Sequence, residues 1–124
     1  MELSVVEEDG VRALEGQPGE RFLSRASDAS RIVEAGFTNR VDAALLYSEN
    51  LTDRFFDLSS GEAGAVLQTL RNYGVRLAVV CPPGAATFSS RFGEALAEER
   101  MRAYFGVFET RAEARAWLAR VMRG

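Results

Sequence analysis

Two short apolar segments constrain the fold of this chain more than any other feature. They are VDAALLY, residues Val41–Tyr47, and VRLAVVC, residues Val75–Cys81, and polar residues surround the first of them. Nearly continuous apolar runs of this length are typical of strands buried on both faces, which occur in parallel sheets covered by helices. The two segments therefore predict an α/β fold.

The segments around these two strands predict the remaining elements. Asp9-Gly10, between the extended runs Leu3–Glu8 and Val11–Gly16, is a two-residue hairpin signal. Apolar spacing and end signals predict helices from Ser27 to about Gly36, over Ser60–Tyr73, around Phe88–Leu96 and onward from a Thr110/Glu113 capping box, and a last strand within Ala103–Phe108. We therefore expect one α/β domain, residues 1–124, with a mixed, mostly parallel sheet of about five strands opened by a β-hairpin and helices packed on the sheet.

The composition excludes several kinds of chemistry. The chain has no histidine, all 15 basic residues are arginine, and there is one cysteine. Histidine-based acid–base catalysis, a phosphate-binding lysine, Schiff-base chemistry and a zinc site within one chain all need residues that are missing. We therefore expect no cofactor, no metal and no catalytic residue, although carboxylates and serines leave an enzyme possible.

Charge and apolar patterning indicate the cellular setting. A net charge of −3 disfavours general nucleic-acid binding, and no apolar run approaches the roughly 20 residues of a membrane span. The acidic N-terminal sequence is unlike a secretory signal, and a single cysteine fits a reducing compartment. We expect a cytoplasmic protein with no nucleic-acid or membrane partner, whose last helix carries a solvated basic face formed by Arg111, Arg115, Arg120 and Arg123.

The segment DLSSGEAG, at the start of a predicted helix, is the best candidate for a site. Ser59 and Glu62 match a second capping box, and Gly61 and Gly64 favour close packing of the helix on its neighbours. Ser60 would then be the first helical residue, exposed and beside the positive end of the helix dipole, where a phosphate is stabilised. Ser60 is therefore a candidate phosphorylation site, with an ordinary surface serine as the alternative.

Polar residues near the ends of the predicted parallel strands form a candidate ligand or partner surface. Sites in open α/β sheets lie at the carboxyl ends of strands. The candidates are Glu49, Asn50, Asp53, Asp57, Ser59, Gly61 and Glu62. The acids could equally be turn-forming and helix-start residues. Cys81, Phe55-Phe56 and Trp117 are expected in the core rather than in a site.

One motif string resembles a known bacterial family. It consists of Phe55-Phe56-Asp57-Leu58, Gly61, Ala63-Gly64, Leu67-Gln68, Asn72-Tyr73 and Leu77-Ala78-Val79. Along nearly its whole length the chain is similar to the family called domain of unknown function 4180. This resemblance implies relatedness and brings no known activity.

A broader resemblance concerns the order of elements. The predicted order is similar to that of the STAS domain of bacterial anti-sigma-factor antagonists, which has a hairpin, helix and strand, then Asp-Ser-Ser-Gly opening a helix, and then strand, helix, strand and helix. In that family the serine or threonine before the glycine accepts a phosphate, and the partner is a kinase that is also an anti-sigma factor; Ser60 matches that position. Here Leu58 separates Asp57 from the serine pair, and the preceding loop is longer.

The resulting expectation is a non-enzymatic, STAS-like regulatory or interaction module with a protein partner. A small ligand-binding domain or enzyme, with a carboxylate and serine pocket at the carboxyl ends of the strands, is the alternative. A homodimer is a third possibility, because an edge strand of the opening hairpin could pair across an interface.

Overall fold

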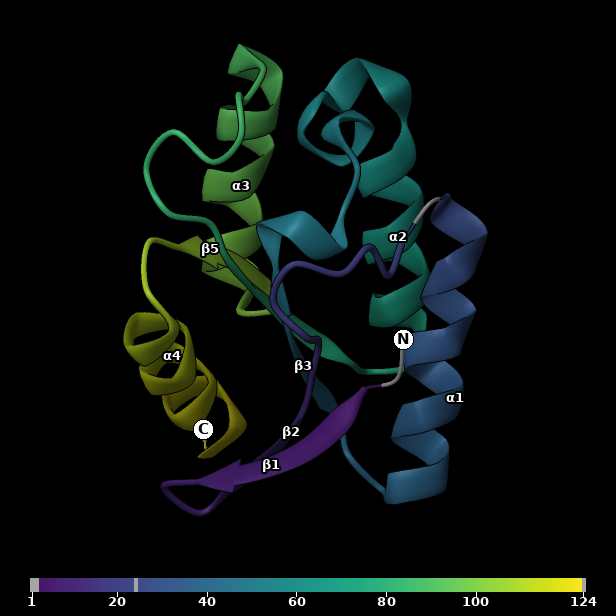
Figure 1. Ribbon diagram of the computed structural model, residues 1–124, viewed down its shortest axis with the longest axis vertical. Helices are drawn as coiled ribbons and strands as arrows, with labels where there is room; N and C mark the ends of the chain where they lie inside the picture. Colours follow the sequence, from purple (N-terminus) through teal and green to yellow (C-terminus); the bar gives the residue numbers. More distant parts are fainter. Residues whose placement is uncertain (1–2, 24, 124) are drawn as a thin grey trace.

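The computed structural model describes residues 3–23 and 25–123 and contains one five-stranded sheet (Figure 1). The strands are β1 (Ser4–Glu8), β2 (Val11–Glu15), β3 (Ala43–Tyr47), β4 (Arg76–Val80) and β5 (Phe105–Phe108). They lie side by side in the order β1-β2-β3-β4-β5. The β1–β2 pair is antiparallel and the other pairs are parallel, which confirms the predicted mixed, mostly parallel sheet opened by a hairpin.

The hairpin turn forms at the predicted dipeptide. Glu8 faces Val11 in the register, which leaves Asp9 and Gly10 as the turn, with φ angles of 54° and 77°. Both residues lie in the left-handed region that a two-residue hairpin of this type requires, which Gly and Asp tolerate. Edge strand β1 is thereby placed against β2, the start of the parallel part of the sheet.

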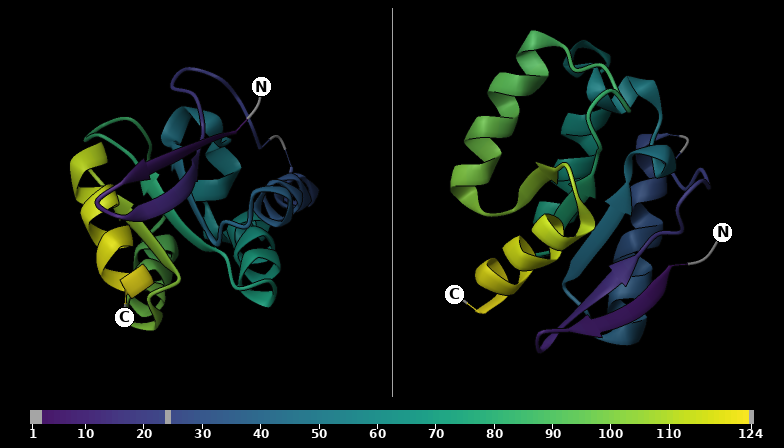
Figure 2. Two further views of the ribbon diagram at one scale, coloured as in Figure 1. Left: turned by 90° about the horizontal axis from the view of Figure 1, so that it is seen from below. Right: turned by 60° about the vertical axis from the view of Figure 1, so that its left-hand side comes forward.

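The helices divide unequally between the two faces of the sheet. They are α1 (Ala29–Asn39), α2 (Glu62–Asn72), α3 (Ser90–Arg102) and α4 (Arg111–Arg123). Helices α1, α2 and α3 each connect neighbouring parallel strands, and right-handed crossovers taken in succession place them on one face. Helix α4 follows the last strand and covers the opposite face (Figure 2).

Alternation along the strands builds two apolar cores. Leu14, Leu46 and Leu77 point to the face covered by α1, α2 and α3, while Leu45 and Val80 point to α4. In the larger core Phe55 lies at the centre of an aromatic group, with ring centroids 5.4 Å from Phe56 and 6.0 Å from both Phe92 and Phe105. The smaller core is filled by Trp117, whose ring lies 5.4 Å from Phe108. The predicted core positions of Phe55-Phe56, Trp117 and Cys81 are confirmed.

The long connection between β3 and α2 differs from the prediction. It folds as three short 3₁₀ turns, Ser48–Asn50, Asp53–Phe56 and Leu58–Ser60, and α2 begins at Glu62 instead of Ser60. Gly61 separates the last turn from α2 with a φ of 75°, a left-handed conformation that glycine adopts readily. The backbone therefore changes direction at Gly61, which delays the helix.

The ends of α1 and α4 also show what particular residues do. Helix α1 continues past Gly36 to Asn39; a Cβ at Gly36 would lie 2.8 Å from the backbone oxygen of Val41, so this glycine permits a close approach. At α4 the amide of Glu113 donates to the hydroxyl of Thr110 over 3.1 Å, as the capping prediction requires. No helix within the described residues is long and apolar enough to cross a membrane.

Candidate functional site

Asn50 is a structural residue and not part of a surface. It is fully buried, and its side chain donates to the backbone oxygens of Gln17 (2.7 Å) and Glu20 (2.5 Å) while accepting from the amide of Tyr47 (2.7 Å). These bonds hold the 17–23 segment against the end of β3 and satisfy groups that would be costly to bury unpaired. The prediction that Asn50 contributes to a ligand or partner surface is wrong.

Three of the predicted carboxylates, Glu49, Asp53 and Asp57, are exposed and serve separate turns, whereas Glu62 is buried. Glu49 accepts from the amide of Gly19 over 3.1 Å. Asp57 accepts from both the amide (3.1 Å) and the hydroxyl (2.7 Å) of Ser59, which is an Asx turn. Asp53 opens the 3₁₀ turn Asp53–Phe56. Among the described residues, no group of three or more Cys, Asp or Glu side chains is arranged to hold a metal ion.

Gly61 is the N-cap residue of α2, and the side-chain hydrogen bond at the start of this helix comes from Ser60 rather than Ser59. The amide of Glu62 donates to the Ser60 hydroxyl oxygen over 3.1 Å, and that hydroxyl donates to the backbone oxygen of Arg54 over 2.5 Å. The Glu62 carboxylate is buried and accepts from the hydroxyl of Thr52 over 3.0 Å. The predicted Ser59/Glu62 capping box is wrong, because the left-handed Gly61 moves Ser59 one step away from the helix.

The two glycines of this segment do not pack closely. A Cβ at Gly61 or at Gly64 would meet nothing within 4 Å. Gly61 is needed for its positive φ, and Gly64 lies on the open side of α2. The close-packing prediction is therefore wrong for both glycines.

Ser60 opens onto a small polar cleft. The cleft has a volume of about 170 Å³ and is lined by Ser60, Gly61 and Glu62 together with Arg25, Ala26 and Arg54. Nε of Arg54 lies 4.0 Å from the Glu62 carboxylate, and the Arg54 side chain is 75% exposed. The sequence did not indicate that these two arginines lie beside Ser60. Arg25 reaches the cleft only because α1 packs beside α2.

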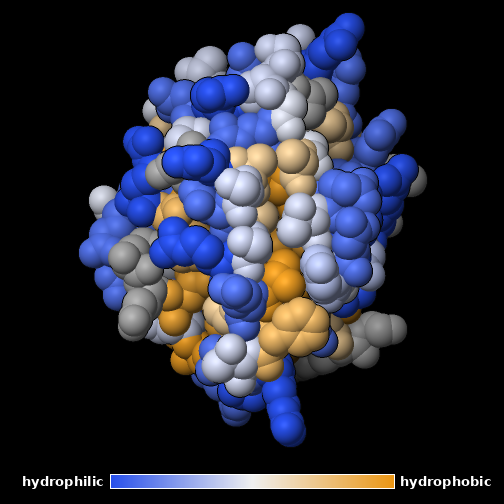
Figure 3. Space-filling view, turned by 90° about the vertical axis from the view of Figure 1, so that its right-hand side faces the viewer, coloured by the Kyte–Doolittle hydropathy of each residue, from blue (hydrophilic) through white to orange (hydrophobic). Residues whose placement is uncertain are grey.

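An apolar groove lies at the other end of the α1–α2 pair. Phe37 and Tyr73 are 70% and 55% exposed, and their rings meet edge to face with centroids 6.0 Å apart. They line a groove of about 130 Å³ together with Val33, Val41 and Val75. Figure 3 shows an apolar strip running between α1 and α2 on this side of the molecule. We call the surface of α1 and α2 between the Ser60 cleft and the Phe37–Tyr73 groove the α1–α2 face.

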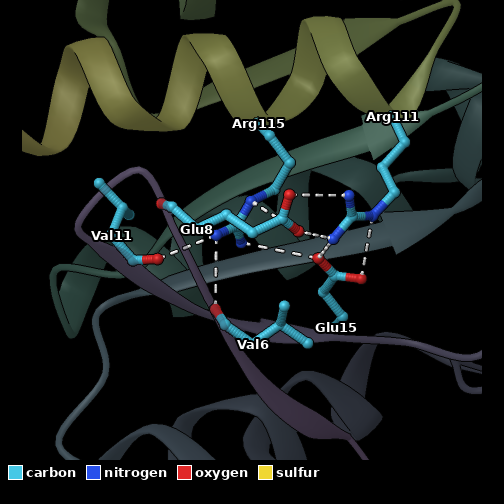
Figure 4. Close-up of polar contacts among 6 residues, drawn as sticks. All are labelled: Val6, Glu8, Val11, Glu15, Arg111 and Arg115. Atoms are coloured by element: carbon cyan, nitrogen blue, oxygen red, sulfur yellow. Dashed lines mark hydrogen bonds and ion pairs between the residues drawn. The ribbon is translucent and has the colours of Figure 1, made fainter.

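A partly buried charge cluster joins α4 to the hairpin (Figure 4). Arg111 binds both carboxylates of the pair Glu8 and Glu15, with its Nη2 lying 2.6 Å from Glu15. Arg115 is 4% exposed and donates to the backbone oxygen of Val11 over 2.9 Å, while its Nη1 lies 3.6 Å from Glu15. The prediction that Arg115 lies on a solvated face is therefore wrong. Arg115 is buried because α4 packs against the hairpin.

The opposite charges of this cluster pair with one another, but among the described residues the buried Nη1 of Arg115 has no hydrogen-bond partner. The hydrogen bond from Arg111 lowers the pKa of Glu8, and the hydrogen bonds from Glu8 and Glu15 raise the pKa of Arg111. At the neighbouring strand ends, burial raises the pKa of the Tyr47 hydroxyl and of the Cys81 thiol, so both stay protonated at neutral pH. The cluster holds elements together, and its arginines are not free to bind an anion.

The fold and these contacts define an α/β domain with an exposed α1–α2 face and a structural ion cluster. The chain belongs to the family described as Domain of unknown function (DUF4180), which matches residues 8–118 and confirms the predicted membership. The match runs from the end of β1 into α4 and includes both ends of the α1–α2 face. No curated protein and no solved structure matches the chain significantly.

Proposed function

We propose that this protein is a non-enzymatic, STAS-like regulatory module that binds a protein partner through the α1–α2 face and is switched by phosphorylation at Ser60. The observation that carries the proposal is the position of Ser60 and of the Phe37–Tyr73 pair at opposite ends of the same face. A modification at one end would then act on a partner held at the other.

The dimensions of the face fit this arrangement. The eleven residues of α2 span about 16 Å. A standard interface covers about 800 Å² on each partner, which corresponds to a patch about 30 Å across. One partner would therefore cover both Ser60 and the exposed aromatic pair, and aromatic side chains are enriched in such interfaces.

A phosphate at Ser60 would change the cleft in two ways. It would replace the hydroxyl proton that Ser60 donates to the backbone oxygen of Arg54. It would also add about −1.5 to −2 charges beside Glu62 and Asp57. The added charge would repel an acidic partner surface, and Arg25 and Arg54, which line the same cleft, are the cations that would pair with the phosphate. Both effects alter the same end of the α1–α2 face.

The order of elements adds support to the STAS-like assignment. The hairpin, α1, β3, a serine pair with glycine before α2, then β4, α3, β5 and α4 follow the order given above for STAS domains. By that resemblance the partner would be a kinase that is also an anti-sigma factor. A cytoplasmic location fits this role and a free, buried Cys81, and self-association through edge strand β1 stays a prediction.

Paired variants test the face and the switch separately. Proteins retained by the wild-type domain are identified, and their affinities for purified variants are measured by calorimetry. Phe37→Glu should weaken binding at least about tenfold, whereas Ala116→Glu on exposed α4, with the same change in charge, should not. Equal losses from both variants would remove the α1–α2 face from the proposal.

The switch is tested with neighbouring serines. Ser60→Asp should weaken partner binding, Ser60→Ala should preserve it, and Ser59→Asp should act as a control for charge at an exposed neighbour. Indistinguishable affinities for Ser60→Asp and Ser60→Ala would show that this position is no switch.

A further inference from the structure

The sheet has one place where the chain changes face between adjacent parallel strands. The connections after β2, β3 and β4 lead to α1, α2 and α3 on one face, whereas the connection after β5 leads to α4 on the other. In open α/β sheets, ligands bind outside the carboxyl ends of the two strands whose connections diverge in this way. For this sheet those strands are β4 and β5.

A cavity of about 250 Å³ lies at this divergence. Cys81 and the Pro82–Gly84 turn bound it after β4, Phe108 and Glu109 bound it after β5, and Leu96 of α3 forms part of the wall. In Figure 1 the loop between β4 and α3 arches outward beside α3 and above the end of β5. The volume is that of about eight liquid waters, which suits a single ring with a short side chain.

The walls of the cavity combine apolar and polar surface and include a partly exposed aromatic ring. Phe88 is 39% exposed, and its inner face is stacked on Phe56 with the ring centroids 5.5 Å apart. This stacking fixes the ring, while its exposed part faces solvent. A fixed, half-exposed ring beside a cavity offers a stacking surface for a second ring at a low cost in side-chain entropy.

Glu109 carries the one carboxylate among the residues that line the cavity. Glu109 is exposed and forms no ion pair with any side chain that the structure describes. The other polar side chain, the Cys81 thiol, has its pKa raised by burial, so it is a neutral wall group rather than a nucleophile. The lining therefore combines an aromatic surface with a single negative charge.

We propose that the cavity between the ends of β4 and β5 binds a small aromatic amine, with its ring against Phe88 and Leu96 and its ammonium group at Glu109. This site is separate from the α1–α2 face, and it does not depend on the Ser60 switch. It also differs from the predicted ligand pocket at Glu49, Asn50, Asp57 and the Ser59–Gly61 turn, where Glu49, Asp57 and Ser59 form hydrogen bonds within turns.

The first experiment uses 2-phenylethylamine as the probe. Trp117 is the only tryptophan, and its ring lies 5.4 Å from Phe108 in the cavity wall, so its fluorescence should respond to binding. Backbone amide shifts of Gly84, Val107 and Glu109 provide a second measurement. We expect saturable changes in the millimolar range, which fits a ligand of this size. No saturable change in either measurement would overturn the proposal.

Two matched probes and four variants make the test specific. Phenylacetate, with the same ring and the opposite charge, should bind at least about fivefold more weakly, and Glu109→Gln should weaken binding of the amine about two- to fivefold. Ala86→Phe or Leu96→Phe should fill the cavity and abolish binding, whereas Ala85→Phe, on the exposed neighbour of Ala86, should bind as the wild type does. Equal binding of phenylacetate, or unchanged binding by both filling variants once their amide spectra show a folded domain, would refute the site.

Discussion

Replacing Arg115 with methionine tests whether the buried arginine of the charge cluster stabilises the fold. The substitution keeps an unbranched stem of similar length but removes the guanidinium. This group donates to three backbone oxygens, that of Val11 over 2.9 Å and those of Val6 and Glu8 over 3.4 Å each. A hydrogen bond from a charged donor contributes about 1.5–3 kcal/mol, and the two longer bonds add less. Glu15 keeps its pairing with Arg111, so the larger cost of an unpaired buried charge is avoided.

These contacts predict a loss of about 2.5 kcal/mol in the free energy of unfolding. For a chain of 124 residues the unfolding entropy is about 260 cal/mol/K, so the Tm should fall by about 10 °C. Urea unfolding followed by circular dichroism measures the change, with the m-value expected to stay constant. Arg111→Met is the matched control and should cost about 1 kcal/mol, because Arg111 is 37% exposed and solvent screens its ion pairs.

The reasoning fails if Arg115→Met is as stable as the wild type. That result would mean that the desolvation of Arg115 cancels its hydrogen bonds, as happens in some buried ion pairs. A loss equal to that of Arg111→Met would mean that burial adds nothing to these contacts. The double variant should lose less than the sum of the single losses, because both arginines share Glu8 and Glu15.

Three further predictions concern the core, the helix glycines and acid stability. Phe55→Ala should cost about 4 kcal/mol in urea unfolding, whereas Phe88→Ala, at a half-exposed ring, should cost less than about 1.5 kcal/mol; similar losses would contradict the packing of the aromatic core. Gly36→Ala should destabilise because its Cβ would lie 2.8 Å from a backbone oxygen, whereas Gly64→Ala, with open space around it, should stabilise by about 0.5–1 kcal/mol; the melting temperatures should move in opposite directions. The hydrogen bond from Arg111 lowers the pKa of Glu8 from 4.5 in the folded state, so the stability that the Glu8 carboxylate contributes is complete above pH 4.5 and is lost as the pH falls through the lowered value. The difference in urea midpoint between wild type and Glu8→Gln should therefore shrink from pH 7 to pH 3. A constant difference would rule out this linkage.

Local sequence patterns determined the elements and their order. The buried strands, the Asp9-Gly10 turn and the Thr110 cap each depend on residues close together in the chain, through side-chain alternation, left-handed turn geometry and a local hydrogen bond. The same patterns predicted the α/β fold class, because a chain in which strands alternate with helices can pack in only a few arrangements. Family membership was predicted from the motif string between Phe55 and Val79, which lies within the matched residues 8–118.

Tertiary packing decided which polar side chains are buried and which residues share a surface. Asn50 is a loop residue by sequence, but it is buried because the distant 17–23 segment folds over it and supplies its acceptors. Arg115 is buried because α4 lies across the hairpin, and Arg25 reaches Ser60 because α1 packs beside α2. Even the cap of α2 depended on a backbone turn at Gly61 that S-x-x-E spacing does not encode. The strengths of these contacts depend on groups far apart in sequence, so their roles were fixed only when the sheet brought them together.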